Sequence, residues 1–191
     1  MTPSPRRRRT SSESPDDGTP PAEQERDPES LARSIALRLL TGAPRSRHQL
    51  AEALARRDVP EDVIERVLDR FTEVGLIDDA EYAQMLVRSQ RESRGLARRA
   101  LSMELRRKGI SAEHAQEALA TVDDAAEEDA ARALLRRRWR SGPGVDPVAQ
   151  SRRALGMLAR KGYPPGLSSR LVREMVDDSA EPWDPAVDSI E

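Results

Sequence analysis

The chain has 191 residues, of which 35% are charged and 3% aromatic, and its formal net charge is −2; it can form one modest core, or several small ones, plus unfolded ends. The lack of cysteine excludes disulfide frameworks, cysteine zinc sites, iron–sulfur clusters and thiol catalysis, and the five aromatic residues are too few for the stacking platforms of RNA-recognition sheets. No apolar run could span a membrane and no secretory signal opens the sequence, so we expect a cytoplasmic protein that contacts no membrane.

The two ends of the chain differ in composition from its middle. Residues 1–29 are rich in proline and serine, hold four consecutive arginines at 6–9 and show no periodicity, which is typical of a disordered segment. Residues 177–191 are also non-periodic and contain six acidic residues and no basic one. The net charge therefore divides into −2, +6 and −6 for residues 1–29, 30–176 and 177–191. The part of the chain that we expect to fold is basic.

One sequence pattern returns three times between these ends. It reads LARRDVP from Leu54, LRRKGIS from Leu105 and LARKGYP from Leu158. The match continues downstream, where the corresponding residues are Leu68, Leu119 and Val172. An Ala-x-x-Leu-aliphatic run precedes each copy, at residues 36–40, 83–87 and 131–135. Recurrence at a spacing of about 50 residues indicates a helical repeat array.

We therefore predict an all-α fold of three tandem three-helix repeats in an elongated, solenoid-like array. No segment alternates between apolar and polar residues as a strand would. The predicted units cover residues 30–78, 79–123 and 124–176, between a disordered tail at 1–29 and an acidic disordered tail at 177–191. A unit of about 50 residues buries little surface alone, so we expect either that neighbouring units supply part of each core or that each unit is only marginally stable.

Helix boundaries are clearest at the end of the first unit. An apolar stripe at helical spacing predicts its third helix, and consists of Val63, Ile64, Val67, Leu68, Phe71 and Val74. Gly75 fits the left-handed position after a helix, with Leu76 as the hydrophobic residue that follows it. Asp78, with Glu81 three residues later, is typical of the capped start of the next helix.

Turn residues recur inside the units. Gly109 and Gly162 stand between the second and third helices of their units, and Asp58 takes that place in the first unit. Gly95 separates the first two helices of the second unit.

No catalytic or metal-binding motif stands out. His48 and His114 lie far apart in the sequence and outside any metal-ligand spacing. The acidic pairs at 78–79 and 123–124 could in principle hold Mg²⁺. Helix capping explains the first pair, and the preference for acids at a helix N-terminus explains the second. With no nucleophile–base pair and no phosphate-binding loop, we expect neither an enzyme nor a cofactor.

Positive charge concentrates in two short segments. Residues 88–108 carry a net charge of +6, and residues 136–140 hold four arginines around Trp139. The candidate partner-binding or DNA-binding residues are Arg88, Arg91, Arg94, Arg98, Arg99, Arg106, Arg107, Lys108, Arg136, Arg137, Arg138 and Arg140. Smaller basic pairs recur at the repeated position, namely Arg56-Arg57, Arg106-Arg107 and Arg160-Lys161.

Two interpretations of this charge are open. Arginine is used almost to the exclusion of lysine, so a merely solvated face in an arginine-rich chain is one of them. Acids concentrate in the tails and the third helices, which favours a basic face directed at phosphate or at an acidic protein surface. Acidic third helices also disfavour a helix-turn-helix that reads DNA bases. In the second unit, Ala97, Leu101 and Leu105 are predicted to form a buried stripe, with Arg99 and Arg106 on the opposite face.

The second unit resembles a known family. Residues 75–83 (GLIDDAEYA) and 93–110 (SRGLARRALSMELRRKGI) are similar to the hallmark segments of the RecX regulatory proteins, in the family's order and spacing. Together with the threefold repeat, the resemblance covers residues 30–176. Its motif residues Gly75, Asp78, Asp79, Tyr82, Gly95 and Gly109 are interpreted as structural, with Tyr82 packed between units.

The resemblance implies three tandem three-helix repeats and a non-enzymatic regulator of the bacterial recombinase RecA. Such proteins bind RecA, lodge in the groove of its filament on single-stranded DNA, and inhibit its recombinase, ATPase and coprotease activities, which modulates DNA repair and the SOS response. We expect a monomer. The alternative is a helical protein that binds DNA without sequence preference and acts without RecA. Residues 141–148 and the acidic C-terminus depart from the family pattern.

Overall fold

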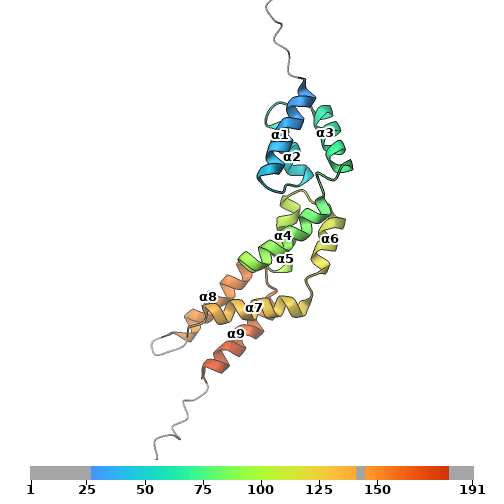
Figure 1. The fold of residues 1–191 in the computed structure, drawn as a ribbon. Helices are drawn as coiled ribbons and strands as arrows, with labels where there is room; N and C mark the ends of the chain where they lie inside the picture. Colours follow the sequence, from blue (N-terminus) through green and yellow to red (C-terminus); the bar gives the residue numbers. More distant parts are fainter. Residues whose placement is uncertain (1–26, 141–144, 181–191) are drawn as a thin grey trace, which may run out of the picture.

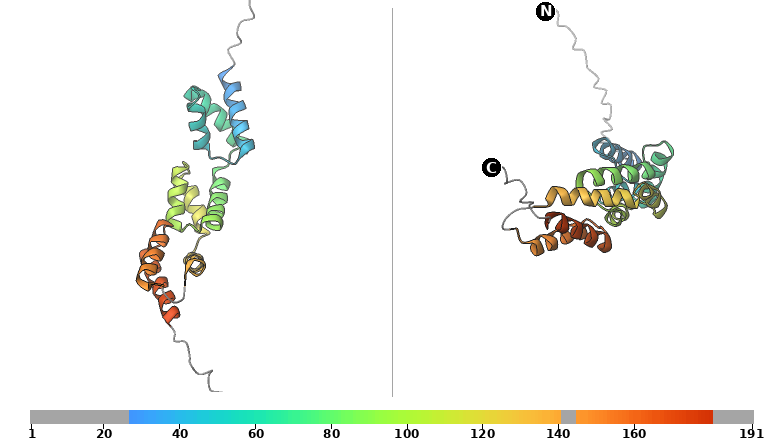
Figure 2. Two further views of the ribbon diagram at one scale, coloured as in Figure 1. Left: turned by 90° about the vertical axis from the view of Figure 1, so that its left-hand side faces the viewer. Right: turned by 90° about the horizontal axis from the view of Figure 1, so that it is seen from below.

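The computed structural model describes residues 27–140 and 145–180, which fold into nine α-helices and contain no strand. The first unit consists of α1 (Pro28–Gly42), α2 (Arg47–Ala55) and α3 (Glu61–Glu73); the second of α4 (Asp79–Arg94), α5 (Arg98–Arg107) and α6 (Ala112–Ala120); and the third of α7 (Asp124–Arg138), α8 (Pro147–Arg160) and α9 (Pro165–Ala180). Figures 1 and 2 show the units following one another in an elongated array. The predicted all-α fold of three tandem three-helix repeats is confirmed.

The ends of the described array differ from the predicted boundaries. Helix α1 begins at Pro28, where Asp27 caps it, rather than at residue 30. Helix α9 continues through Ala180, into the segment predicted as an acidic tail. The indole Nε1 of Trp139 donates a hydrogen bond to Ser179 Oγ at 2.8 Å, which holds this last turn against the end of α7. The rest of both predicted tails lies outside the described residues.

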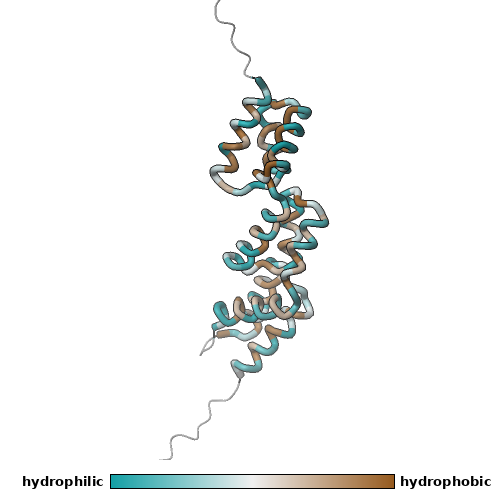
Figure 3. The backbone as a smooth tube through the Cα atoms, turned by 45° about the vertical axis from the view of Figure 1, so that its right-hand side comes forward, coloured by the Kyte–Doolittle hydropathy of each residue, from teal (hydrophilic) through white to brown (hydrophobic). Residues whose placement is uncertain are grey.

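Equivalent residues of the repeat occupy equivalent places in the structure. Leu54, Leu105 and Leu158 are fully buried on the second helix of each unit. The first alanine of each upstream run is fully buried as well, on the first helix; these are Ala36, Ala83 and Ala131. A side chain as small as alanine lets neighbouring helices approach closely. Figure 3 shows hydrophobic and hydrophilic residues interspersed along the helices, as amphipathic packing requires.

Each unit has its own hydrophobic core, and among the described residues a neighbouring unit contributes to a core at one residue. The buried apolar residues of the described chain form three clusters that follow the three units. Ala97 alone crosses a junction, because it is fully buried in the cluster of the third unit. The predicted stripe of Ala97, Leu101 and Leu105 is therefore buried, but against two different units.

Helix ends follow the predicted signals with one exception. Asp78 accepts a hydrogen bond from the Glu81 backbone N–H at 2.8 Å and begins α4. Gly75 ends α3 with a φ of +72°. Because α3 stops at Glu73, the helical spacing no longer directs Val74 to the core, and Val74 is 50% exposed. Leu76 is 47% exposed, and Ile77 is the residue after the turn that is buried.

The turns between second and third helices share one backbone conformation. Asp58, Gly109 and Gly162 have φ angles of +58°, +71° and +88°. Glycine adopts this region without a steric penalty, and aspartate is among the few other residues that tolerate it. The predicted equivalence of these three positions is confirmed.

Two of the hydrogen bonds between the first and second units are made by the residues that start α2. The Ser46 hydroxyl donates to the carbonyl oxygen of Lys108, in the α5–α6 turn, at 2.6 Å. The Arg47 backbone N–H donates to Asp79 Oδ1, in the first turn of α4, at 2.9 Å. The first N–H groups of a helix lack partners within that helix, and a carboxylate is favoured there by the helix dipole.

A similar pair of hydrogen bonds, made by the residues that start α5, helps to join the second unit to the third. The Ala97 N–H, at the start of α5, donates to the carbonyl oxygen of Lys161, in the α8–α9 turn, at 2.9 Å. The Arg98 N–H donates to Glu127 Oε1, on α7, at 2.7 Å. Both junctions thus place the second helix of one unit against a turn and a carboxylate of the next unit. The array repeats its junctions as well as its helices.

A tyrosine strengthens each junction. The Tyr82 hydroxyl on α4 donates to Gln49 Oε1 of the first unit at 3.0 Å, and the predicted packing of Tyr82 between units is confirmed. At the second junction the Tyr163 hydroxyl donates to the carbonyl oxygen of Gly95 at 3.1 Å. Burial, followed by the nearby Glu127 carboxylate, raises the pKa of Tyr163 to about 12, so its hydroxyl stays protonated.

Replacing Gly162 tests whether the second junction depends on close approach. A Cβ at Gly162 would lie 2.7 Å from the Ala100 backbone nitrogen, whereas a Cβ at Gly75 would meet nothing within 4 Å. Both positions have a positive φ, so each alanine variant should lose about 1 kcal/mol of unfolding free energy from backbone strain. Gly162→Ala should lose about 1–3 kcal/mol more, because the third unit must move away from α5.

Urea denaturation of the Gly162→Ala and Gly75→Ala proteins measures this difference. Equal losses in the two variants would show that the junction accommodates a methyl group and would contradict the prediction.

Candidate partner-binding surface

The predicted basic residues lie on α4, α5 and α7 and just beyond the last two of these helices. All of them are exposed except Arg91 and Lys108, which are half-buried. Many stand in the last turn of a helix: Arg94 ends α4, Arg107 ends α5 and Arg138 ends α7. The negative end of a helix dipole favours cations, so part of the arginine pattern stabilises the helices themselves.

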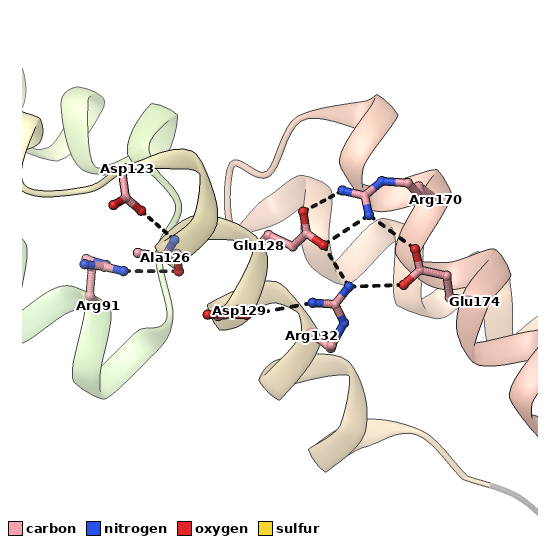
Figure 4. Close-up of polar contacts among 8 residues, drawn as sticks. All are labelled: Arg91, Asp123, Ala126, Glu128, Asp129, Arg132, Arg170 and Glu174. Carbon is pink, nitrogen blue, oxygen red and sulfur yellow. Dashed lines mark hydrogen bonds and ion pairs between the residues drawn. The ribbon is translucent and has the colours of Figure 1, made fainter.

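Some of the predicted residues are held by contacts within the protein. Glu104 is only 16% exposed; it pairs with Arg94 at 3.6 Å and also with Arg107. The Arg91 guanidinium donates to the carbonyl oxygen of Ala126 at 3.3 Å and so bridges α4 to α7 (Figure 4). These three arginines have structural roles whatever else they bind.

The structure brings the two predicted basic segments together at the second junction. The ammonium of Lys161 donates to the carbonyl oxygen of Arg94. Burial lowers the pKa of Lys161, and the neighbouring charges of Arg94, Arg138 and Arg137 lower it further. Nearby like charges make an ammonium easier to deprotonate, and these three arginines and Lys161 therefore form one local group of positive charges. We name Arg94, Arg137, Arg138 and Lys161 the junction cluster.

An arginine-rimmed hollow of about 380 Å³ lies next to this cluster, between the end of α7 and α8. Its lining includes Arg138, Arg140, Arg153, Arg160, Trp139 and Met157. We name it the arginine hollow. Sequence reasoning did not include Arg153 and Arg160 among the candidates. Arg160 belongs to the recurring basic pair and could have been found by that signal, whereas Arg153 carries no signal apart from its charge.

A second hollow, of about 350 Å³, lies between α5 and α6. Arg98 and Arg106 stand at its border, and Ile110 and Leu119 are among its apolar lining residues. Arg98 and Arg106 therefore belong to a different surface from the arginine hollow, and the predicted residues do not form one continuous site.

An ion network fixes α7 against α9 and occupies Arg132 and Arg170, which were not among the candidate residues (Figure 4). Glu128 accepts hydrogen bonds from Arg132 at 2.7 Å and from Arg170 at 2.6 Å. Glu174 accepts from the same two arginines, at 3.2 Å each. The hydrogen bonds from Arg170 and then Arg132 lower the pKa of Glu128 from its ordinary value of 4.5 to about 2.

The described part of the chain has neither a metal-binding cluster nor a membrane-spanning helix. Within residues 27–140 and 145–180, no group of three or more histidine, aspartate or glutamate side chains could hold a metal ion. None of the helices in the same ranges is long and apolar enough to cross a membrane.

Family models and curated proteins that match this chain are all of the RecX family. Three family models match in order: the first three-helix domain of RecX over residues 32–71, the second over 78–119 and the third over 126–172. A curated protein named regulatory protein RecX from Streptomyces coelicolor is 49% identical over 172 residues, which are 90% of this chain and 89% of its own length. One of the same name from Thermobifida fusca is 51% identical over 146 residues, or 76% and 79% of the two chains.

Solved structures share the fold. The crystal structure of RecX from Lactobacillus salivarius superposes with a TM-score of 0.66 at 21% identity, and covers 78% of this chain and 97% of that one. A second crystal structure, of a regulatory protein RecX, has a TM-score of 0.63 at 26% identity over 80% of this chain and 72% of that one.

The ion network predicts a pH dependence of stability. A carboxyl whose pKa is lowered by folding stabilises the protein above its unfolded pKa, and that stability is lost as the pH falls through the folded pKa. Glu128→Gln should lower the urea midpoint at neutral pH. Its difference from the wild-type protein should shrink below the ordinary pKa of 4.5 and vanish near the folded pKa of about 2.

Glu117→Gln is the matched control, because Glu117 is exposed on α6 and makes no ion pair within the described residues. A Glu128→Gln difference that stayed constant between neutral pH and about pH 3 would contradict the assigned pKa.

Proposed function

The chain belongs to the RecX family of regulatory proteins, and from this premise we propose that it binds the recombinase RecA and its filament on single-stranded DNA. It inhibits the recombinase, ATPase and coprotease activities of that filament and so modulates DNA repair and the SOS response. The observation that carries the proposal is the match of all three RecX domains, in order, to the three units of the array. The protein acts in the cytoplasm as a monomer, without catalysis of its own.

The shape and charge of the array support this role. A nucleoprotein filament offers a long groove lined by repeated surfaces and by phosphate. An elongated array of three units can follow such a groove, and exposed arginines suit both phosphates and carboxylates because the guanidinium forms two parallel hydrogen bonds. We assign the first contact to the junction cluster, where residues of the second and third units converge.

The ATPase activity of RecA tests the proposal. Substoichiometric amounts of the protein should slow hydrolysis of ATP by RecA on single-stranded DNA. Arg137→Glu with Arg138→Glu should raise the half-inhibiting concentration about tenfold or more, because each lost charged hydrogen bond costs about 1.5–3 kcal/mol.

The control is Arg38→Glu with Arg173→Glu, which changes the net charge equally at exposed arginines of α1 and α9. An unchanged ATPase rate across a broad titration of the wild-type protein would reject the proposed function. Equal effects of the two double variants would reject the assigned contact alone.

Direct DNA binding without RecA is the second candidate. It is favoured by Arg98 and Arg106, which are exposed beside one hollow and whose guanidinium groups make no ion pair among the described residues. Their neighbour Arg99 is exposed on the same helix. Phosphate contacts release counterions, so affinity should fall steeply as salt rises.

A filter-binding series with a single-stranded oligonucleotide measures this salt dependence. The logarithm of affinity should fall with the logarithm of salt by about 0.7 for each phosphate contact, and Arg99→Glu with Arg106→Glu should flatten the slope. Binding that does not change with salt would reject this candidate. Loss of DNA binding with inhibition of RecA intact would separate the two functions.

A further inference from the structure

The arginine hollow combines an apolar lining with a positive rim that makes no ion pair among the described residues. Trp139 and Met157 are half-buried in it. The rim arginines, Arg138, Arg140, Arg153 and Arg160, are all exposed. Every ion pair between described residues lies elsewhere, so no described carboxylate neutralises this rim. An occupant that fits should be both acidic and apolar.

The C-terminal helix ends beside this hollow. Trp139 donates its indole N–H to Ser179 Oγ at 2.8 Å, and Ser179 in turn donates to the carbonyl oxygen of Met175 at 2.7 Å. The same indole lines the hollow. The chain therefore leaves α9 next to the lining of the hollow, and the residues that follow start within reach of it.

The sequence that follows has the required chemistry. Residues 181–191 read EPWDPAVDSIE, with four acidic residues, no basic residue and the apolar side chains of Trp183 and Ile190. Trp183 is four residues beyond Ser179, a span of at most about 14 Å for an extended chain. Two prolines in the segment reduce the conformational entropy that it would lose on docking.

We propose that residues 181–191 dock in the arginine hollow, with the indole of Trp183 against the apolar lining and the carboxylates on the rim arginines. A tethered segment has an effective concentration on the order of millimolar, so the tail outcompetes a free ligand of similar chemistry for the hollow. Exposed arginine–carboxylate pairs are individually weak and screened by salt, so docking is reversible. The tail thus restricts access to part of the basic surface, and an acidic or phosphate-bearing partner must displace it. This docking does not depend on the proposed action on RecA.

The absence of native cysteine makes a direct test practical in the full chain. Ser189→Cys carries a nitroxide spin label, and methionine methyl groups enriched in carbon-13 report by NMR. The Met157 methyl reports on the hollow, whereas Met103, 60% exposed on α5, is the internal reference. Docking predicts that the label broadens the Met157 signal at least twofold more than the Met103 signal, and that high salt removes most of this difference.

Charge reversal on α8 distinguishes docking from mere tethering. Because the tail is attached to α9, its label would broaden nearby signals even without docking. The decisive quantity is therefore the difference in Met157 broadening between variants. Arg153→Glu with Arg160→Glu should restore the Met157 signal at least twofold. Arg152→Glu with Arg173→Glu should leave it broadened, since these exposed arginines lie outside the hollow on α8 and α9. Equal Met157 signals in both double variants would overturn the proposal.

A second measurement needs no label. Trp183→Ala in the full chain should move the Met157 methyl resonance and leave that of Met103 in place, and an unmoved Met157 resonance would overturn the proposal. Met157 could instead respond to a single-stranded oligonucleotide and not to charge reversal of the tail at Asp184 and Asp188. That result would assign the hollow to nucleic acid and also overturn tail docking.

Discussion

The first N–H groups of α2 and α5 have no partner within their own helices, and the array depends on how the next unit satisfies them. At the first junction a carboxylate of the next unit accepts from the Arg47 N–H, and a turn carbonyl accepts from the Ser46 hydroxyl. At the second junction a carboxylate accepts from the Arg98 N–H, and a turn carbonyl accepts from the Ala97 N–H. Such bonds require close approach, so the turn carries glycine at 109 and 162, where a Cβ would collide with the preceding unit. Orientation is set by directional polar contacts, while the three cores stay separate. A chain with few apolar residues can in this way form an elongated fold from several small hydrophobic cores.

This arrangement gives the arginines two uses. Arginines at helix C-termini interact favourably with the negative end of the helix dipole. Arg91, Arg94 and Arg107 are also bound to carbonyl or carboxylate groups of the protein. Arg137 and Arg138 instead lie near Lys161 and Arg94, where the ends of α4 and α7 meet the α8–α9 turn. The same construction that joins the second and third units therefore also gathers positive charge in one place.

Local features of the fold could be predicted because they depend on neighbours in the sequence. The capped start at Asp78, the left-handed turn at Gly75 and the equivalence of Asp58 with Gly109 all follow from short-range rules. Errors appear where a residue's environment depends on distant parts. Val74 and Leu76 fit the apolar pattern but face solvent, and Ala97 is buried in the core of a unit that begins after it. The candidate surface shows the same limit. The dense basic run of the sequence predicted Arg138 and Arg140, but Arg153 became a candidate only because it lines the hollow.

The sequence by itself determined the number of units, their helices and turns, the separation of basic middle from acidic end, and the family, because periodicity, capping and motif spacing are written along the chain. The tertiary structure alone decided which unit each buried residue serves, which arginines are held internally, and which converge from α4, α7 and α8 onto one junction. It also placed the end of α9 beside Trp139. These features rest on contacts between residues tens of positions apart, whose geometry follows from how rigid units are oriented by a few directional hydrogen bonds.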